Sequence, residues 1–219
     1  MNEDRSGRHR RLAAAWLYLC VDRRAEQGDL ERLLDAVCRA GVDLIQLRDK
    51  RATRDEQREA SAVFRTITQR YSALFIMNDD PELAVEVGAD GVHVGQDDPP
   101  PPQARLVVGP DLLIGRSTHD RSQIDRALVE DCDYFTVGPV YETPTKQGRP
   151  GIGLTPLRHA AQVAGDRPWF VSGAMSVATA PAALAAGARR LVVVRAITQA
   201  ADPVEAVRAL TELVRAKRR

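Results

Sequence analysis

Short apolar runs alternate with longer amphipathic stretches along the whole chain. Each run is four to six residues long and consists mostly of Val, Ile, Leu or aromatic residues, without the polar alternation of a half-exposed strand. Unbroken runs of this kind are typical of strands that are covered on both faces, as in a parallel sheet. They predict strands near residues 16–21, 42–47, 73–77, 91–94, 112–115, 134–137, 168–171 and 191–194.

The stretches between these runs carry an apolar residue every three or four positions, which predicts helices. Examples are Leu30, Leu33, Leu34 and Val37 in the first stretch. Eight strands that are each followed by a helix predict a (β/α)8 TIM barrel, the α/β fold in which helices surround a closed parallel sheet.

A recurring junction supports this alternation. Gly41, Gly88 and Gly187 each stand between a predicted helix and the next predicted strand. Glycine readily takes the left-handed conformation that ends a helix, so the chain can turn there into a strand. Because many α/β proteins end helices in this way, the junction indicates the fold and leaves the function open.

The pattern also bounds the domain organisation. No linker divides the chain, so we expect a single catalytic barrel domain over residues 12–219, preceded by a charged, solvated tail over residues 1–11. Arginines before the apolar run 12–21 imitate an export signal, but no small-residue cleavage site follows, which favours a first strand. No other stretch approaches the roughly 20 apolar residues of a membrane span. We therefore expect a cytoplasmic protein without a membrane partner.

Composition excludes several classes of protein. The 219 residues are 44% hydrophobic and 28% charged, which is ordinary for a globular domain and excludes bulk disorder. The 31 basic and 30 acidic residues nearly balance, whereas a nucleic-acid-binding protein usually shows a basic excess. The three cysteines form no CxxC motif and suit a reducing compartment, and the four histidines have no zinc-ligand spacing. The sequence leaves the oligomeric state open, a homo-oligomer included.

Polar residues collect where the predicted strands end, which in a parallel barrel is the face that carries active sites. Gln46, Arg48 and Lys50 follow the second strand at alternate positions, so they lie on one side, opposite Leu47. An amide and two cations in a row could bind an anion. Solvated charges at a strand exit are the alternative interpretation.

Two carboxylates follow neighbouring strands. Asp79 stands after the third strand and Asp98 after the fourth, so they could face each other across adjacent loops. Two carboxylates that share a cation with waters and phosphate oxygens are the usual arrangement for Mg²⁺. Alternatively, Asp79 or Asp80 caps the helix that begins at Pro81. The spacing leaves both interpretations open.

The later strands lead to groups that suit phosphate. The fifth strand ends near Ser117, and the sixth leads into the long, glycine-punctuated loop 138–153, which is typical of a lid, with an ordinary surface loop as the alternative. The seventh strand is followed by Gly173, and the eighth ends at Val194 and is followed by Arg195. In barrels the loops after these two strands frequently bind phosphate through backbone N–H groups.

Taken in chain order, these motifs resemble the thiamine-phosphate synthase family. The motifs are Gln-Leu-Arg-x-Lys, Asn-Asp-Asp, Gly-x-His-x-Gly-Gln-x-Asp, Gly-x-Ser-x-His and Gly-Pro-Val-x-x-Thr-x-Thr-Lys, within a resemblance from about Leu17 to Leu213. The resemblance implies a (β/α)8 barrel that joins 4-amino-5-hydroxymethyl-2-methylpyrimidine diphosphate to a thiazole (carboxy)ethyl phosphate. The products would be thiamine phosphate and pyrophosphate, and the cofactor would be Mg²⁺.

The resemblance also implies roles for individual residues. Those that would bind the pyrimidine diphosphate are Gln46, Leu47, Arg48, Asp49, Lys50, Asn78, Ser117 and Lys146. Those that would bind the thiazole phosphate are Thr143, Pro144, Thr145, Gly173, Ala174, Val194 and Arg195. Asp79 and Asp98 would hold Mg²⁺, and the catalytic residues would be Arg48, Lys50, Ser117 and Lys146.

Two positions depart from the commonest family pattern. Family members often carry a second glycine at the position of Ala174 and a serine at the position of Arg195. The N–H donor of the glycine survives at Ala174 if the local φ is negative, so we expect this change to be tolerated. Arg195 either binds phosphate or extends into solvent.

Two other functions are compatible with parts of the pattern. Thiazole tautomerases, which are isomerases, resemble this family and use a histidine that corresponds to His119, but they lack the full diphosphate and metal set. A non-catalytic barrel that binds thiamine precursors would need phosphate contacts and no metal-binding acids, so the pairing of Asp79 with Asp98 disfavours it.

Overall fold

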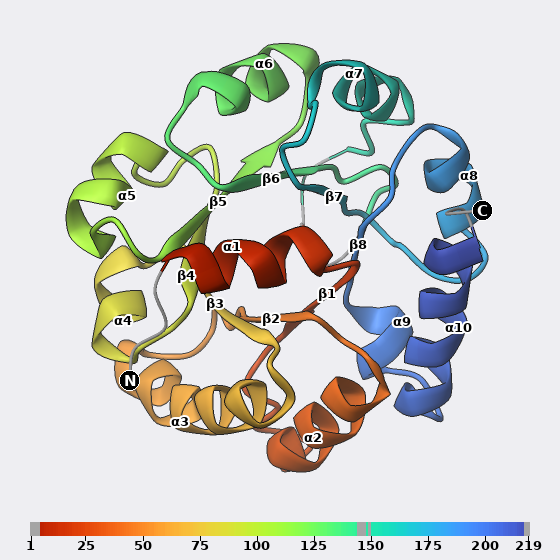
Figure 1. Cartoon of the computed structure of the whole chain (residues 1–219). Coiled ribbons are helices and arrows are strands. Elements are labelled where there is room, and N and C mark those ends of the chain that lie inside the picture. The colour runs from red at the N-terminus through yellow and green to blue at the C-terminus, as the bar shows by residue number, and fades with distance from the viewer. Residues whose placement is uncertain (1–4, 144–147, 149, 217–219) are drawn as a thin grey trace.

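Eight parallel strands close into a barrel in sequence order (Figure 1). In this computed structural model, which describes residues 5–143, 148 and 150–216, β8 pairs with β1 and completes the ring. The strands are β1 (Leu17–Val21), β2 (Leu44–Leu47), β3 (Leu74–Asn78), β4 (Gly91–Val94), β5 (Leu113–Thr118), β6 (Tyr134–Val137), β7 (Trp169–Val171) and β8 (Leu191–Val193). The predicted (β/α)8 barrel is confirmed.

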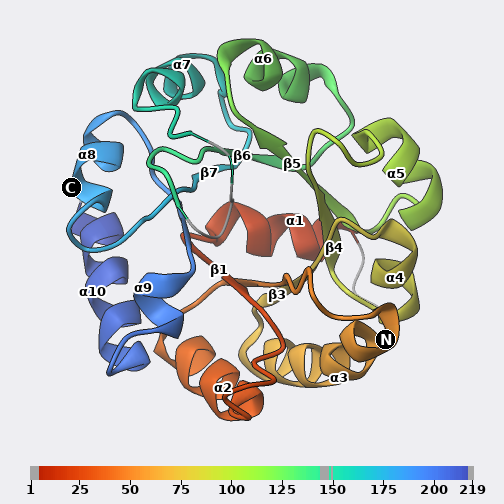
Figure 2. The same cartoon turned by 180° about the vertical axis from the view of Figure 1, so that it is seen from behind.

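Helices surround the sheet on all sides (Figures 1 and 2). They are α2 (Leu30–Ala40), α3 (Arg54–Tyr71), α4 (Pro81–Glu86), α5 (Pro101–Val108), α6 (Arg121–Val129), α7 (Thr155–Val163), α8 (Ala180–Ala185), α9 (Arg195–Thr198) and α10 (Pro203–Ala216), with α1 (Arg5–Ala14) before β1. No helix within the described ranges is both long and apolar enough to cross a membrane. The predicted junction glycines Gly41, Gly88 and Gly187 have φ values of 115°, 67° and 104°, so all three take positive φ as expected.

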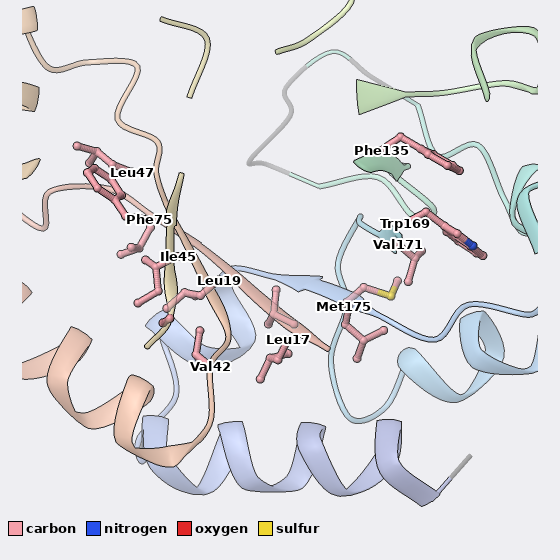
Figure 3. Close-up of a cluster of buried hydrophobic side chains, with 14 of the residues drawn as sticks. Leu17, Leu19, Val42, Ile45, Leu47, Phe75, Phe135, Trp169, Val171 and Met175 are labelled. Carbon is pink, nitrogen blue, oxygen red and sulfur yellow. The ribbon is translucent and has the colours of Figure 1, made fainter. Parts of the chain in front are cut away.

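Alternation along each strand divides the buried residues into two cores. Ile45 and Leu47 point outward and belong to the large core between sheet and helices, part of which Figure 3 shows. Leu44 points inward, into a smaller core that fills the barrel together with Tyr18 and Phe170. The barrel formed by the described residues is therefore packed with side chains and contains no open channel.

Helix α1 lies across the N-terminal end of the barrel (Figure 1). Its Leu12 is buried in the inner core, and its Arg8 and Arg11 both pair with Asp90, at 3.1 and 2.8 Å. The expected solvated tail is therefore wrong for residues 5–11, which form most of this helix. The charges that suggested a tail instead meet carboxylates at the starts of strands.

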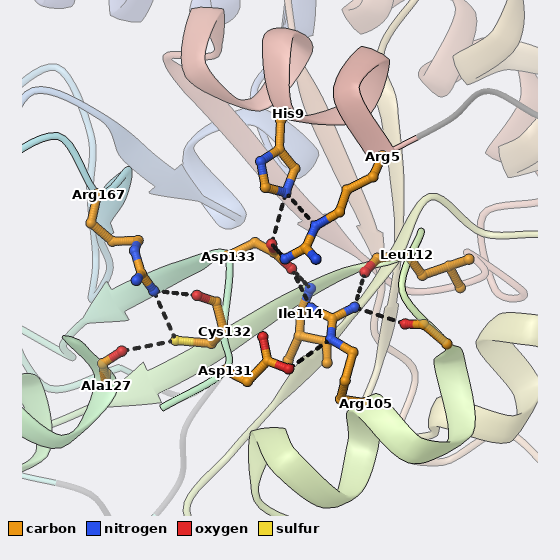
Figure 4. Close-up of polar contacts among 11 residues, drawn as sticks. Arg5, His9, Arg105, Leu112, Ile114, Ala127, Asp131, Cys132, Asp133 and Arg167 are labelled. Atoms are coloured by element: carbon orange, nitrogen blue, oxygen red, sulfur yellow. Dashed lines mark hydrogen bonds and ion pairs between the residues drawn. The ribbon is translucent and has the colours of Figure 1, made fainter. Parts of the chain in front are cut away.

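Three aspartates repeat one contact at this N-terminal end. Asp43, Asp90 and Asp133 stand directly before β2, β4 and β6. Each accepts a backbone N–H near the start of the preceding strand, from Leu17 at 3.0 Å, Phe75 at 2.9 Å and Ile114 at 2.7 Å, respectively. Figure 4 shows the most elaborate of the three, in which Asp133 also binds Arg5 and His9 of α1 and Arg105 of α5.

Candidate active site

The mouth of the barrel lies at the opposite, C-terminal end, where the loops that follow the strands meet (Figure 2). From β2, Gln46 points inward, and its Oε1 accepts a hydrogen bond from Cys20 Sγ at 2.9 Å. Its Nε2 is buried and has no hydrogen-bond partner in the part of the chain that the structure describes. Because an unpaired buried amide costs about 1–3 kcal/mol, this N–H₂ group is suited to meet a bound ligand.

The next inward residue, Arg48, is half-buried at the rim of the mouth. Its guanidinium forms no hydrogen bond or ion pair with any other residue in the described ranges. A cation without a counter-ion beside an unpaired amide favours the anion-binding interpretation of this strand end.

The residues between these positions face the other way. Leu47 is fully buried in the outer core, so only its backbone could touch a ligand in the mouth. The Asp49 carboxylate accepts the Arg51 N–H at 3.1 Å and pairs with Arg23 at 3.3 Å. Asp49 therefore holds the loop that presents Lys50.

The ends of β3 and β4 bring the two predicted metal ligands together. Asp79 pairs with Lys50 Nζ at 3.2 Å and interacts directly with Asp98. Burial raises the pKa of the Asp98 carboxyl, and the neighbouring Asp79 adds to the increase, whereas the Gly95 N–H at 2.6 Å and Lys50 oppose it. Two adjacent carboxylates with one exposed lysine between them form a site of negative charge that a cation would complete.

The capping alternative applies to the neighbouring residue. Asp80 Oδ1 accepts the Leu83 N–H at 2.8 Å and caps α4. Asp79 instead takes a left-handed backbone conformation with φ of 63°, and its carboxylate is directed at Lys50. A pocket of about 280 Å³ opens here, lined by Asp49, Lys50, Arg54, Gln57, Asn78, Asp79, Asp80 and Leu83.

Two histidines lie on the far side of the mouth. Ser117, at the end of β5, is buried, and its Oγ lies 2.9 Å from His93 Nε2 on β4. His119, the position of interest for a tautomerase, has its Nδ1 2.5 Å from the Gly138 carbonyl oxygen. A carbonyl oxygen can only accept, so Nδ1 carries the proton in His119.

The loops after β6 and β7 are joined by close backbone contacts. The Val140 N–H donates to the Ser172 carbonyl oxygen at 2.8 Å, and a Cβ on Gly173 would come within 2.3 Å of Val140 N. Glycine is therefore required at position 173. Thr143 is buried, whereas the predicted residues Pro144, Thr145 and Lys146 lie outside the described residues.

The departures from the family pattern differ in their outcome. Ala174 has φ of 51°, so the condition of a negative φ is not met: the chain stays left-handed after Gly173 as it turns away from β7. This conformation costs a residue with a Cβ roughly 1–2 kcal/mol. Val194 immediately precedes α9, and the Arg195 side chain that follows it is exposed.

Two polar residues of the mouth received no role from the sequence. Ser172 is buried, and its Oγ has no partner within the described ranges. His93 contacts Ser117 inside the barrel. Alternation could have identified Ser172, because Phe170 points into the barrel and Ser172, two positions later, lies on the same face of the strand. The contact of His93 with Ser117 depends on the register between β4 and β5, which the sequence pattern does not give.

The closed (β/α)8 barrel defines this chain as a TIM-barrel protein. Its C-terminal mouth holds a carboxylate pair, together with an arginine and an amide nitrogen that have no polar partner among the described residues. The chain belongs to the family described as thiamine monophosphate synthase, whose sequence profile matches residues 17–197.

Individual relatives agree with this assignment. The thiamine-phosphate synthase of Mycobacterium sp. (strain KMS) is 49% identical over 210 residues, which cover 92% of this chain and 93% of that protein. The protein of the same name from Acidothermus cellulolyticus is 50% identical over 196 residues, covering 89% and 92%. Among solved structures, a thiamine phosphate pyrophosphorylase from Pyrococcus furiosus superposes with a TM-score of 0.82 at 29% identity, covering 94% of this chain and 98% of that one.

Proposed function

We propose that this protein condenses hydroxymethylpyrimidine diphosphate with a thiazole phosphate and releases pyrophosphate, forming thiamine phosphate. Membership in the thiamine monophosphate synthase family over residues 17–197 is the observation that carries the proposal. The Arg48 guanidinium and Gln46 Nε2 support it, because they have no polar partner among the described residues and can bind a charged, hydrogen-bonding substrate.

Charge explains why the cations must be local. Each terminal phosphate carries about −1.5 to −2 charge near neutral pH, and the net charge of the chain is +1. The overall field therefore cannot hold two phosphorylated substrates. Arg48 and Lys50 lie where β2 ends, and Lys146 is proposed to join them from the loop that follows β6.

The same cations would serve the chemical step. The bond between the pyrimidine methylene carbon and a diphosphate oxygen breaks, and negative charge grows on that oxygen as pyrophosphate leaves. Arg48 and Lys50 stabilise this charge, and Ser117 holds the substrate by a hydrogen bond. The thiazole nitrogen then forms the new bond to the methylene carbon, so no protein nucleophile takes part. Groups fixed in advance in such a site typically contribute several kcal/mol to a transition state.

Asp79 and Asp98 would hold Mg²⁺. Their adjacency and the raised pKa of Asp98, which burial causes first and Asp79 increases, fit a site that gains from a cation. The described residues contain no cluster of three or more metal-binding side chains, which suits Mg²⁺ because this ion keeps waters and phosphate oxygens as ligands. When bound, the ion would neutralise the charge that develops on the departing diphosphate.

The proposal is tested by incubating the purified protein with both substrates and Mg²⁺ and measuring pyrophosphate and thiamine phosphate. We expect equal amounts of the two products, and no thiamine phosphate when the thiazole phosphate is omitted. A protein that only interconverted thiazole carboxylate isomers would be a tautomerase, and the proposal would be rejected.

A second experiment concerns the metal. Asp98→Asn should raise the Mg²⁺ concentration needed for half-maximal rate by roughly 10-fold or more, because one of two carboxylate ligands loses its charge. Asp97→Asn, a change at the exposed neighbouring residue, is the matched control and should leave that concentration unchanged. Equal Mg²⁺ requirements in both variants would remove the metal assignment.

A further inference from the structure

A chain of hydrogen bonds runs through the interior of the barrel to Ser117. The Tyr18 hydroxyl lies 3.1 Å from the Tyr134 hydroxyl, which lies 3.3 Å from His93 Nδ1, and His93 Nε2 lies 2.9 Å from Ser117 Oγ. The four residues come from β1, β6, β4 and β5, and all are buried. Polar groups placed this deep are costly unless they are paired, so their arrangement requires a physical reason.

The neighbouring sequence makes room for this chain. Gly115 stands between Leu113, which points into the barrel below it, and Ser117 above it. A Cβ at Gly115 would come within 2.2 Å of the Tyr134 ring and within 2.4 Å of His93 Nδ1. The glycine of the Gly-x-Ser motif therefore keeps open the space in which Tyr134 meets His93.

Counting protons shows which group donates and which accepts in each of these hydrogen bonds. A phenol has one proton, and burial raises the pKa of both Tyr18 and Tyr134, so both keep it. Within the described residues, the only hydrogen-bond partner of the Tyr18 hydroxyl is Tyr134. If Tyr134 donated to Tyr18, the buried Tyr18 O–H would have no acceptor, so Tyr18 donates and the Tyr134 proton goes to His93 Nδ1.

This direction determines the state of Ser117. With Nδ1 accepting, a neutral His93 carries its proton on Nε2 and donates to Ser117 Oγ. The Ser117 O–H is then directed away from His93, toward the mouth of the barrel. Because His93 does not accept the Ser117 proton, the hydroxyl can donate that proton to the substrate.

We propose that His93, oriented by Tyr134, is a positioning residue that fixes Ser117 as a hydrogen-bond donor to the pyrimidine diphosphate substrate. The identity of that substrate rests on the proposed function. The tautomer of His93 and the orientation of Ser117 do not, so the two parts can be tested separately.

The tautomer is tested without substrate. Long-range ¹H–¹⁵N correlation spectra of the folded protein, with His93→Gln used to assign the signals, show which ring nitrogen carries the proton. We expect the proton on Nε2 in the wild-type protein and a shift of the population toward Nδ1–H in Tyr134→Phe, where Nδ1 has lost its donor. A proton on Nδ1 in the wild-type protein would overturn the proposal whether or not the protein is a synthase.

Kinetics test the consequence for Ser117. Tyr134→Phe should lower kcat/KM for the pyrimidine diphosphate roughly 10-fold and leave the KM for the thiazole phosphate unchanged, since one oriented hydrogen bond weakens. Tyr18→Phe is the matched change: it removes a buried hydroxyl from the same cluster but leaves Tyr134 free to donate to His93. Tyr18→Phe should lower kcat/KM for the pyrimidine diphosphate less than about threefold.

Variants of His93 supply a second comparison. His93→Gln keeps an N–H donor that can reach Ser117 and should retain more activity than His93→Leu, which has none, by roughly 10-fold. A purely structural role predicts equal losses in Tyr134→Phe and Tyr18→Phe and no advantage for Gln over Leu, and that result would overturn the proposal.

Discussion

The two ends of the barrel use the same kinds of residue in opposite ways. At the N-terminal end, Asp133 is saturated, because it accepts the Ile114 N–H and binds Arg5 and Arg105 (Figure 4). At the C-terminal end, Asp79 and Asp98 face each other, and Arg48 has no partner within the described ranges. The charges around Asp133 hold strands and helices together, whereas the charge of Arg48 at the second end stays available to a ligand.

The contrast shows where stability and function are separated in this fold. Helix α1 lies across the N-terminal end, and its Arg8 and Arg11 pair with Asp90 there (Figure 1). The mouth must stay open to substrate. Polar groups there that lack a partner among the described residues lower the stability of the free protein, and a bound substrate would satisfy them. Substitutions at the two ends should therefore change different measured quantities.

The largest effect is expected at the mouth. Arg48→Gln should lower kcat/KM for the pyrimidine diphosphate by roughly 10²- to 10³-fold, because a cation is lost where charge grows in the transition state. Since the Arg48 side chain forms no hydrogen bond or ion pair with the other described residues, the melting temperature should stay within a few degrees. The measurements are steady-state kinetics and thermal unfolding, with the exposed Arg32→Gln on α2 as the control. A large loss of stability with normal kinetics would contradict the comparison.

The converse is expected at the closed end. Asp133→Asn should lower the free energy of unfolding by about 2–3 kcal/mol, since it removes a buried charge that faces Arg105; Arg5 and His9 are more exposed and add less. The kcat of the folded protein should not change. Urea unfolding measures the first quantity. Asp131→Asn, which removes a more exposed partner of the same Arg105, is the control and should cost far less.

The sequence predicts the fold well because strand burial is local information. The predicted strand at 134–137 coincides with β6, and the predicted strand at 91–94 coincides with β4. The role of Asp133 escaped prediction because its partner, the Ile114 N–H, comes alongside only when the strands pair. Helix α1 was missed for the same reason. Its arginines pair with carboxylates far away in the sequence, so the sequence alone does not distinguish this segment from a solvated tail.

At the mouth, alternation was sufficient for some residues and insufficient for others. It correctly placed Gln46 on the face opposite Leu47, because side chains of a strand alternate. It could not show that Ser117 meets His93, since that contact depends on how β5 aligns with β4. Nor could it give the backbone of Ala174, where the turn after β7 imposes a positive φ.

The closed end should also determine the response to acid. Burial alone would raise the pKa of Asp133, but the Ile114 N–H and the guanidinium groups of Arg105 and Arg5 outweigh it, so the pKa is lowered. A lowered pKa adds stability above the ordinary carboxyl value of about 3.9, and that stability is lost as the pH falls through the lower folded value.

The stability gap between the wild-type protein and Asp133→Asn should therefore be constant from about pH 7 to pH 5 and narrow below about pH 4. Urea unfolding of both proteins at several pH values measures this gap. A gap that widened toward low pH would mean that Asp133 is not ionised in the folded protein.

The smallest effect is expected at Ala174, where a residue at the C-terminal end should influence stability through backbone strain. Ala174 has φ of 51°, which glycine adopts without the cost that a Cβ imposes. Ala174→Gly should raise the free energy of unfolding by up to about 1 kcal/mol, because the relief of strain exceeds the greater freedom of glycine in the unfolded chain. Ala182→Gly, at an exposed position of α8, should lower it by about 0.5–1 kcal/mol. If Ala174→Gly destabilised the protein as much as the control does, the positive φ would cost nothing, and strain would not distinguish this part of the mouth from the rest of the barrel.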